Sequence, residues 1–383
     1  MQRNILKLFK MTLTTKILPV EVSSISFNGT KLEVSDSTTK HNLDIASEEV
    51  RKPGHVVAFP TETVYGLGGS ALCDDSVRAI YAAKNRPADN PLIVHVSSQE
   101  QIERLLLPKS HKIPAVYDQL IKKFWPGPLT ILLPVEEGSP VSELTTAGQN
   151  TVGVRMPSHP VARALIAQSD TPLAAPSANA STRPSPTMAS HVYHDLSGRI
   201  PYILDGGACD VGVESTVVDG LTNPPMLLRP GGVSAEDIRK YGGGPWENII
   251  MAKKTAGKTE AVRTPGMKYR HYSPSAKVVL FDGCKDGSKA VKSWLERQAD
   301  FDPRKVALLR GAQFASAAEL GLEGAHERIL GSSATEMAHN LFKMLREVDE
   351  LNVELILVEG VEETGDGLAV MNRLSKAAFE VVR

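Results

Sequence analysis

The sequence predicts an α/β protein built from two domains. The chain has 383 residues, which is more than one domain of ordinary size contains. Short apolar runs alternate with amphipathic helical patterns along most of the chain, as they do in α/β folds. This alternation stops after Gly244 and restarts near residue 277, which marks a boundary between a larger first domain and a smaller second one.

Short apolar runs predict the strands of the first domain. Each run is bounded by proline, glycine or polar residues, which is typical of the places where strands end. The runs cover residues 55–60, 91–96, 128–135, 151–157, 172–176, 202–207, 215–220 and 226–231.

Helical patterns lie between these strands, and each begins at a residue type that caps helices. The first follows Asp74 or Asp75, the second is opened by Ser158, and the third is opened by Ser234. Strands and helices in alternation give a sheet with helices packed against it. The three patterns are DDSVRAIYAAKN (74–85), SHPVARALIAQS (158–169) and SAEDIRKYG (234–242).

A basic segment separates the two domains. Residues 251–277 contain seven Lys or Arg residues and one acid, Glu260, with little apolar pattern. We therefore predict a first domain over 41–245, a linker over 246–276 and a second domain over 277–383. In the second domain three apolar runs alternate with helical patterns, one of which is opened by a capping box of Ser333 and Glu336. This rhythm predicts a smaller, Rossmann-like parallel α/β domain.

Residues 1–40 are predicted to be an extension that precedes the first domain. Basic residues such as Arg3 and Lys7 occur in its first twenty positions without any acid, which is the composition of a mitochondrial presequence. A frayed, solvated terminus gives the same composition. We expect the protein in the cytoplasm, with a mitochondrial destination as an open alternative.

Composition excludes several classes of protein. The formal net charge of -1 excludes a uniformly basic nucleic-acid coat. No apolar run approaches the roughly 18 residues that a membrane helix needs, so no membrane partner is expected. Cys73, Cys209 and Cys284 lie far apart and form no CxxC pair, which indicates a reducing compartment and no zinc ribbon. His191 and His194 share a helix face but are read as surface residues, so no metal ligands are assigned.

Cations and hydroxyls gather in the loops that follow the predicted strands. Lys84 and Arg86 end a helix, while Arg155 and Arg229 lie near strand ends. Guanidinium groups bind phosphate or carboxylate with two parallel hydrogen bonds. Any one of these cations could instead form a surface ion pair, and the Ser- and Thr-rich loop 175–187 could be a plain surface loop. Because strand-end loops converge on one crevice, the set predicts a phosphate-bearing ligand beside a small anionic substrate.

A series of motifs in these loops resembles the YrdC-like threonylcarbamoyl-AMP synthases. The resemblance runs from about residue 45 to the end, and its closing segments resemble the long, two-domain form of that family. It implies a YrdC-like twisted, mixed open sheet with a concave basic crevice. The motifs are FPTETVYGLG (59–68), KNRPADNPLIVH (84–95), WPGPLT (125–130), TVGVRMPSHP (151–160), the Ser- and Asn-containing loop 175–187, GVESTVVD (212–219), LRPGG (228–232), TPGMKYRHYSP (264–274) and MNRLSKAA (371–378).

The resemblance implies a reaction and its substrates. The family makes L-threonylcarbamoyl-AMP and pyrophosphate from L-threonine, bicarbonate or CO₂, and ATP. A separate transferase complex then passes the threonylcarbamoyl group to an adenosine beside the tRNA anticodon. The protein is therefore expected to be a nucleotidyltransferase that uses ATP as a substrate with Mg²⁺ on its phosphates, and that binds tRNA weakly at most.

The resemblance also implies roles for individual residues. Lys84 and Arg86 are expected to be catalytic, through neutralisation of the charge on the phosphates. L-Threonine is expected to contact Thr63, His95, Arg155, Ala175 and Ser215. ATP is expected to contact Lys84, Arg86, Asn90, Thr151, Ser177, Asn179, Ser185, Arg229, Tyr269 and His271.

Two alternatives from other classes remain open. A non-catalytic RNA-binding module would use the same cations, but it would also need aromatic residues beside them for stacking on bases. Tyr65 and Tyr81 are the nearest aromatic residues in the sequence. A carbamoyl transferase of the hydrogenase-maturation kind also contains a YrdC-like domain, but it carries cysteine-rich zinc segments that three scattered cysteines do not provide.

Overall fold

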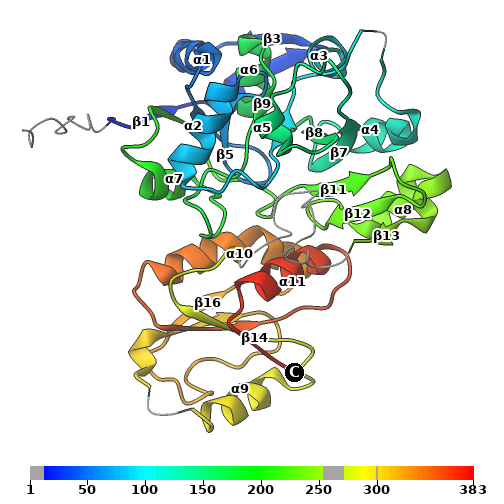
Figure 1. Ribbon diagram of the computed structural model, residues 1–383. Coiled ribbons are helices and arrows are strands. Elements are labelled where there is room, and N and C mark those ends of the chain that lie inside the picture. The colour runs from blue at the N-terminus through cyan, green and yellow to red at the C-terminus, as the bar shows by residue number, and fades with distance from the viewer. Residues whose placement is uncertain (1–12, 110, 253–270, 299–300) are drawn as a thin grey trace, which may run out of the picture.

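The first domain is built on one large mixed sheet. The computed structural model describes residues 13–109, 111–252, 271–298 and 301–383. Within these ranges the sheet has eleven strands and contains both parallel and antiparallel neighbours (Figure 1). Their order is β1 (Lys16–Pro19), β10 (Tyr202–Asp205), β4 (Val57–Phe59), β5 (Gly66–Ser70), β9 (Leu173–Ala174), β6 (Ile93–His95), β8 (Thr151–Arg155), β7 (Leu129–Pro134), β11 (Thr216–Asp219), β12 (Met226–Arg229) and β13 (Ile250–Met251).

Each apolar run predicted as a strand contains one, and the glycine-rich strand β5 was not predicted. Its sequence GLGGS looks like a turn because glycine is depleted in strands. The structure gives the reason for Gly68: a Cβ there would lie 2.5 Å from a ring carbon of Phe59 on the neighbouring strand β4. Close approach of an aromatic ring therefore requires glycine at this strand position.

Helices cover the sheet, and two of their predicted caps lie one residue away from the observed ones. Helix α2 begins at Asp74 with Cys73 as N-cap, and helix α6 has His159 as N-cap in place of Ser158. Ser234 caps helix α8 as predicted. The helices of the first domain are α1 (Ser37–Arg51), α2 (Asp74–Lys84), α3 (Gln99–Leu105), α4 (Asp118–Phe124), α5 (Glu143–Thr146), α6 (Pro160–Ser169), α7 (Ala189–Leu196) and α8 (Ala235–Gly242), and short 3₁₀ turns cover Val22–Ser24, Ala115–Tyr117 and Gly244–Asn248.

Residues 16–40 belong to the first domain, whereas the sequence predicted them to be part of an extension that precedes it. Strand β1 pairs in parallel with β10 at the edge of the large sheet. A hairpin of β2 (Ile25–Asn28) and β3 (Lys31–Val34) follows, and helix α1 crosses the predicted boundary at residue 40. Leu43 and Val50 of α1 are fully buried in a cluster with α6, so the segment is part of the core. Residues 1–12 lie outside the described ranges.

The start of the predicted linker also belongs to the first domain. Trp246 is fully buried in the main hydrophobic cluster of that domain, and its indole Nε1 donates to Val116 O at 2.7 Å. Strand β13 then pairs with β12. Of the rest of the predicted linker, residues 253–270 lie outside the described ranges.

The second domain is a five-stranded parallel sheet with helices, within the described part of the chain, as the alternation predicted. The capping box of Ser333 and Glu336 opens helix α10 as expected. Strands β16 and β18 were not predicted; both lie at sheet edges and carry exposed residues. The strand order is β16 (His326–Ile329), β15 (Val306–Arg310), β17 (Leu355–Glu359), β14 (Lys277–Phe281) and β18 (Glu380–Val382), and the helices are α9 (Gly287–Leu295), α10 (Ala334–Asp349) and α11 (Asp366–Ala377), with a 3₁₀ turn at Pro303–Lys305.

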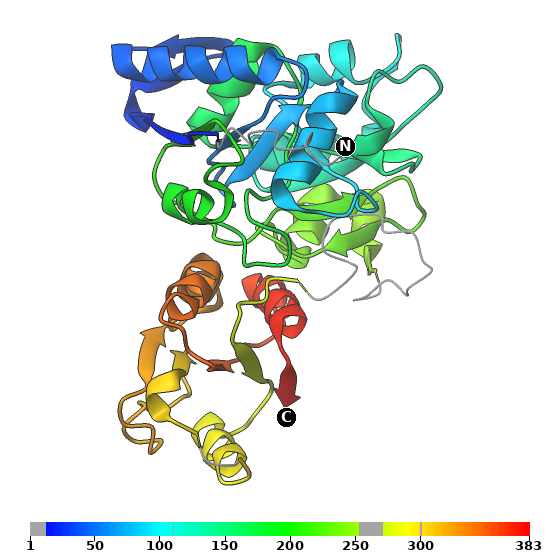
Figure 2. The ribbon, with the colours of Figure 1, turned by 60° about the vertical axis from the view of Figure 1, so that its left-hand side comes forward.

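Helices α10 and α11 face the first domain (Figures 1 and 2). Arg346 of α10 is buried against Asp195 of α7, with Nη2 and Oδ2 2.8 Å apart. The same guanidinium donates from Nε to Pro184 O at 3.0 Å. Since Pro184 lies in the loop 175–187, the second domain directly contacts a loop that the sequence assigns to the crevice.

Candidate active site at the strand-end loops

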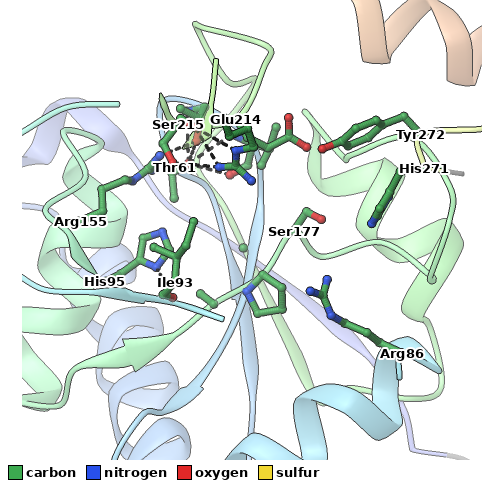
Figure 3. Close-up of a pocket in the computed structure, with 16 residues that line it drawn as sticks. Thr61, Arg86, Ile93, His95, Arg155, Ser177, Glu214, Ser215, His271 and Tyr272 are labelled. Carbon is green, nitrogen blue, oxygen red and sulfur yellow. Dashed lines mark hydrogen bonds between the residues drawn. The ribbon is translucent and has the colours of Figure 1, made fainter. Parts of the chain in front are cut away.

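A pocket opens where the loops after several strands of the first domain meet (Figure 3). It lies over β4, β6, β8 and β12, as expected for ligand sites at strand ends. Nine of the predicted binding residues line it, and one of these, His271, comes from the described end of the linker. The lining residues are Thr61, Thr63, Val64, Gly66, Arg86, Ile93, His95, Arg155, Ala175, Pro176, Ser177, Glu214, Ser215, Arg229, His271 and Tyr272.

Arg155, the last residue of β8, points into the pocket with its side chain only 2% exposed. Its Nη1 donates to Thr63 Oγ1 at 2.9 Å, and its Nη2 lies 3.4 Å from Oε2 of Glu62. Its Nε has no hydrogen-bond partner. Burial lowers the pKa of the guanidinium, and Glu62 opposes that effect. A buried guanidinium with unused donors is suited to bind a carboxylate.

The turn that holds Thr63 is organised by Thr61. The hydroxyl of Thr61 donates to Val64 O at 2.7 Å and accepts from the backbone N–H groups of Thr63 and Val64 at 3.2 Å. Short hydroxyl side chains stabilise turns in this way. The turn therefore fixes the Thr63 hydroxyl beside Arg155.

His95 ends strand β6 and lies beside Arg155 in the pocket (Figure 3). Burial, together with the charge of Arg155, lowers the pKa of His95 to about 3. The imidazole is therefore neutral at physiological pH, and its Nδ1 lies 3.2 Å from Ile93 O. If Nδ1 carries the proton in that contact, the other ring nitrogen is an acceptor.

Ser215 and Arg229 form one hydrogen-bonded unit in the lining of the pocket. Arg229 donates to Ser215 O from Nε at 3.1 Å and from Nη2 at 2.9 Å. The Ser215 hydroxyl lies 2.8 Å from Thr130 Oγ1 and 3.2 Å from Arg229 Nη2. Burial lowers the pKa of Arg229 to about 10, so it is a cation at physiological pH.

Glu214 joins the two domains at the pocket. Its Oε1 accepts from Ser185 Oγ at 2.7 Å, and its Oε2 accepts from Arg373 Nε of α11 at 2.9 Å. Burial by itself would raise the pKa of Glu214, but Arg373 and Arg229 lower it to about 2. The carboxylate is therefore ionised, and the hydroxyl of Tyr272 points toward it (Figure 3).

Lys84, the last residue of α2, and Arg86, two residues later, have different surroundings. Arg86 lines the pocket, and its Nε and Nη2 are buried without a partner. Lys84 does not line the pocket: its ammonium donates to the carbonyl oxygens of Ser177 and Asn179, the latter at 2.6 Å. Burial holds the pKa of Lys84 well below its ordinary value. Arg86 therefore offers free donors to a ligand, whereas Lys84 supports the loop that carries Ser177.

His271 and Tyr272 come from the described end of the linker and close one side of the pocket. Their rings lie 4.8 Å apart, and Tyr272 packs on Phe342 of α10 at 5.2 Å. Burial lowers the pKa of His271 to about 4 and raises the pKa of Tyr272 to about 12, so both side chains are neutral at physiological pH. Tyr269, which the sequence also assigned to ATP, lies outside the described residues.

The structure does not place every predicted residue at the pocket. Asn179 and Ser185 lie behind it, where Asn179 Nδ2 donates to the carbonyl oxygens of Ala180 and Arg183 and Ser185 donates to Glu214. Asn90 is buried near α2, and its carbonyl accepts from Tyr81. Thr151 begins β8 and Arg155 ends it, so the two are about 13 Å apart along the strand.

Thr61, Glu62 and Arg373 are among the residues in or beside the pocket that have no role in the sequence-based assignment. Thr61 and Glu62 belong to the quoted motif 59–68, where their polarity within a buried turn was the available signal. Arg373 is distant in sequence, so its contact with Glu214 depends on how the domains dock. No local pattern reveals such a contact.

Among the described residues, no cluster of three or more His, Cys, Asp or Glu side chains is arranged to hold a metal ion. Glu214 is the carboxylate that lines the pocket, and it is already bonded to Arg373 and Ser185. None of the described helices combines the length and apolar composition that crossing a lipid bilayer requires.

Comparison with known proteins gives the family. A family model described as "Telomere recombination" matches residues 49–231, and one described as "Threonylcarbamoyl-AMP synthase, C-terminal domain" matches residues 233–379. The chain belongs to the Sua5/YrdC family. Both matches together cover the two domains seen in the structure, so the chain has the two-domain form of the family.

Relatives named threonylcarbamoyl-AMP synthase align with the Sua5/YrdC-family chain over almost its whole length. The protein of Schizosaccharomyces pombe is 51% identical over 95% of this chain and 94% of its own length. The protein of Pyrococcus abyssi is 45% identical over 91% of this chain and 97% of its own length. The protein of Bacillus subtilis is 42% identical over 91% of this chain and 96% of its own length.

A solved structure also matches both domains of this Sua5/YrdC chain. The crystal structure of Pyrococcus abyssi Sua5 complexed with L-threonine has a TM-score of 0.80 and 42% sequence identity. The match covers 96% of this chain and 99% of that one. The predicted mixed open sheet followed by a separate parallel domain is thereby confirmed.

Proposed function

We propose that this chain is an L-threonylcarbamoyladenylate synthase, the enzyme that joins L-threonine, bicarbonate or CO₂, and ATP into L-threonylcarbamoyl-AMP with release of pyrophosphate. The observation that carries the proposal is one pocket with two kinds of cationic subsite. Arg155 lies buried beside Thr63 and His95. Arg86 lies across the pocket from Arg155, and Arg229, which also lines the pocket, is hydrogen-bonded to Ser215. Such an arrangement suits a small carboxylate beside a polyphosphate.

L-Threonine would occupy the end of the pocket formed by Arg155 and its neighbours. Arg155 would bind the carboxylate through its unused donors. Thr63, His95 and Ser215 would surround the remaining polar groups of the substrate, and Ala175 would contribute backbone and a small side chain. The neutral imidazole of His95 avoids a repulsive charge beside the substrate ammonium.

ATP would occupy the part of the pocket that contains Arg86, Ser177, Arg229 and His271. The free donors of Arg86 are placed to bind phosphate oxygens. Lys84, Asn179 and Ser185 would act from behind, by holding the loop that presents Ser177. Tyr269, Asn90 and Thr151 remain predictions from the resemblance.

The chemistry requires positioning and charge neutralisation. The neutral amine of threonine attacks CO₂ and loses a proton, giving a carbamate. A carbamate oxygen then attacks the α-phosphorus of ATP, and the bond to the pyrophosphate leaving group breaks in line. Arg86 and Arg229 would neutralise the charge that accumulates on the phosphates. No covalent enzyme intermediate is needed, so the pocket requires no activated nucleophile.

Mg²⁺ would enter with the nucleotide. Since the pocket carboxylate Glu214 is bonded to Arg373 and Ser185, the described residues offer no free carboxylate to an ion there. The ion would be held by phosphate oxygens and water, as is common for Mg²⁺ bound with ATP. It would supply additional charge neutralisation on the phosphates.

The product would be transferred to tRNA by a separate threonylcarbamoyl transferase complex. The pocket lies at the strand-end loops and is closed on one side by His271 and Tyr272. If the protein passes the adenylate to that complex, it needs to bind tRNA only weakly or not at all. We further propose a cytoplasmic location, with a mitochondrial form as an alternative to be tested by imaging of tagged full-length protein.

The test is direct. Purified protein is incubated with ATP, L-threonine and bicarbonate, and the mixture is examined by mass spectrometry for the adenylate and by a coupled assay for pyrophosphate. Formation of both, dependent on all three substrates, supports the proposal. Absence of the adenylate, together with salt-dependent tRNA binding, would instead favour the non-catalytic RNA-binding module.

A further inference from the structure

Glu62 lies directly behind the guanidinium that would bind the substrate carboxylate. We propose that Glu62 is a positioning residue that fixes Arg155 for recognition of the amino-acid carboxylate; this rests on the proposed function. Glu62 follows strand β4, does not line the pocket, and is not expected to touch substrate. It would act only through Arg155.

The contacts of Glu62 connect two strand-end loops. Its Oε2 lies 3.4 Å from Arg155 Nη2 and accepts from the backbone N–H of Ser158 at 3.2 Å. Its backbone carbonyl accepts from Val211 N at 2.8 Å. The carboxylate therefore connects the loop after β4 to the loop after β8, next to Arg155 at the end of β8.

Arg155 has few other contacts that define its orientation. Its Nη1 donates to Thr63, and its Nε is buried without a partner. An arginine side chain has several rotatable bonds, so one hydrogen bond leaves it free to turn. The second anchor at Glu62 holds Nη2, which leaves Nε and the remaining N–H groups for a ligand.

The charge of Glu62 matters as well as its shape. The side chains of Glu62 and Arg155 are 7% and 2% exposed, so the guanidinium has little water to stabilise it. A carboxylate behind it stabilises the ionised form that a substrate carboxylate requires. Oε1 of Glu62 is buried without a hydrogen-bond partner, so the carboxylate is not fully hydrogen-bonded, as it would be in a purely structural ion pair.

Two substitutions test this role. Glu62→Gln removes the charge but retains size and one acceptor, and Glu62→Asp retains the charge but shortens the reach. Glu49→Gln is a matched control: Glu49 is also buried and paired, to Lys52 and His55, but lies on α1 outside the pocket. Binding is measured by calorimetry for ATP, for L-threonine, and for L-threoninol, which has no carboxylate.

We expect Glu62→Gln to weaken L-threonine binding by about 10- to 100-fold, the range typical when a residue that orients a binding group is lost. Affinity for L-threoninol and ATP should be unchanged, because neither uses Arg155 for a carboxylate. Glu62→Asp should fall between the wild type and Glu62→Gln, and Glu49→Gln should bind all three ligands normally. In an Arg155→Lys background the additional effect of Glu62→Gln should be small.

Other outcomes would overturn the inference. Equal weakening of all three ligands by Glu62→Gln would indicate a general structural role, and unchanged L-threonine binding would remove Glu62 from recognition. Binding and adenylate formation by the wild-type protein distinguish these results from a failure of the proposed function. If wild-type protein binds neither L-threonine nor ATP and forms no adenylate, the enzyme assignment fails, and this inference fails with it.

Discussion

Arg373 Nε of helix α11 lies 2.9 Å from Oε2 of Glu214, across the boundary between the two domains. Arg373 is fully buried, and it also donates to Pro230 O in the loop after β12. Because Glu214 lines the pocket and accepts from Ser185, the bond from Arg373 connects the second domain to the candidate site. The second domain is thus part of how the pocket is held together.

Arg373→Ala is expected to lower the free energy of unfolding by ~3–5 kcal/mol, because it removes the guanidinium that is bonded to the buried carboxylate of Glu214. Adenylate formation should fall as well, since Glu214 and Ser185 lose their orientation. Chemical denaturation and the pyrophosphate assay measure the two effects. Arg383→Ala is the control: its pair with Asp282 is exposed, so the loss should be at most ~1 kcal/mol. Equal losses in both variants would contradict this assignment.

Arg86→Ala is expected to reduce pyrophosphate release by ~100-fold, the range seen when one charge-stabilising donor is removed. Its stability should change little, because the Nε and Nη2 atoms of Arg86 have no partner to lose. Lys84→Ala should reduce both activity and stability, since it frees the carbonyl groups of Ser177 and Asn179. Near-normal turnover in Arg86→Ala would remove that residue from the site. A Lys84→Ala protein as stable as wild type would contradict the supporting role.

The sequence predicted the fold where local patterns decide it. Strands such as β7 and β17 are continuous apolar runs, and Ser234 and Ser333 cap their helices as expected. Strand β5 was missed because the close packing of the Phe59 ring, on the neighbouring strand β4, leaves no space for a side chain at Gly68. This contact between strands is not visible in the local sequence. Strand β1 was missed because its place at the sheet edge depends on pairing with β10.

The candidate site was predictable only in part, for a similar reason. Arginines at strand ends pointed to the pocket because strand-end loops meet in space. Arg86 faces the pocket, whereas Lys84 faces backbone carbonyl groups. This difference depends on packing, and neither the residue type nor the spacing in the sequence reveals it. The contribution of Arg373 required the docked second domain.

Stability is expected to fall as pH decreases from about 6.5 to 4, in part through His191. Burial and the nearby charge of Arg346 lower the pKa of His191 from its ordinary 6.5 to about 4. The unfolded chain therefore takes up a proton in this window while the folded protein does not, so acid favours unfolding. Nδ1 of His191 also accepts from the Thr187 N–H, a bond that protonation at Nδ1 would break.

His191→Gln should flatten this part of the stability profile, because glutamine does not titrate. Urea denaturation at several pH values measures the slope for both proteins. A slope in His191→Gln as steep as in wild type would mean that other groups produce the acid sensitivity.

The amino-acid preference is expected to follow the order threonine, serine, valine. Valine has a methyl group where threonine has its hydroxyl, so it would leave polar groups of the pocket unpaired, and rejection by such a site reaches ~10⁴-fold. Serine keeps the hydroxyl and lacks one methyl group, which is worth roughly 1–3 kcal/mol. Competition assays of kcat/KM for the three amino acids give the order.

Ser215→Ala tests whether the Ser215 hydroxyl, held by Thr130 and Arg229, contacts the substrate hydroxyl. If it does, the ratio of kcat/KM for threonine over valine should fall more than the ratio for threonine over serine. If valine reacts better than serine in the wild type, the pocket distinguishes shape alone, and the assignment of Ser215 is wrong.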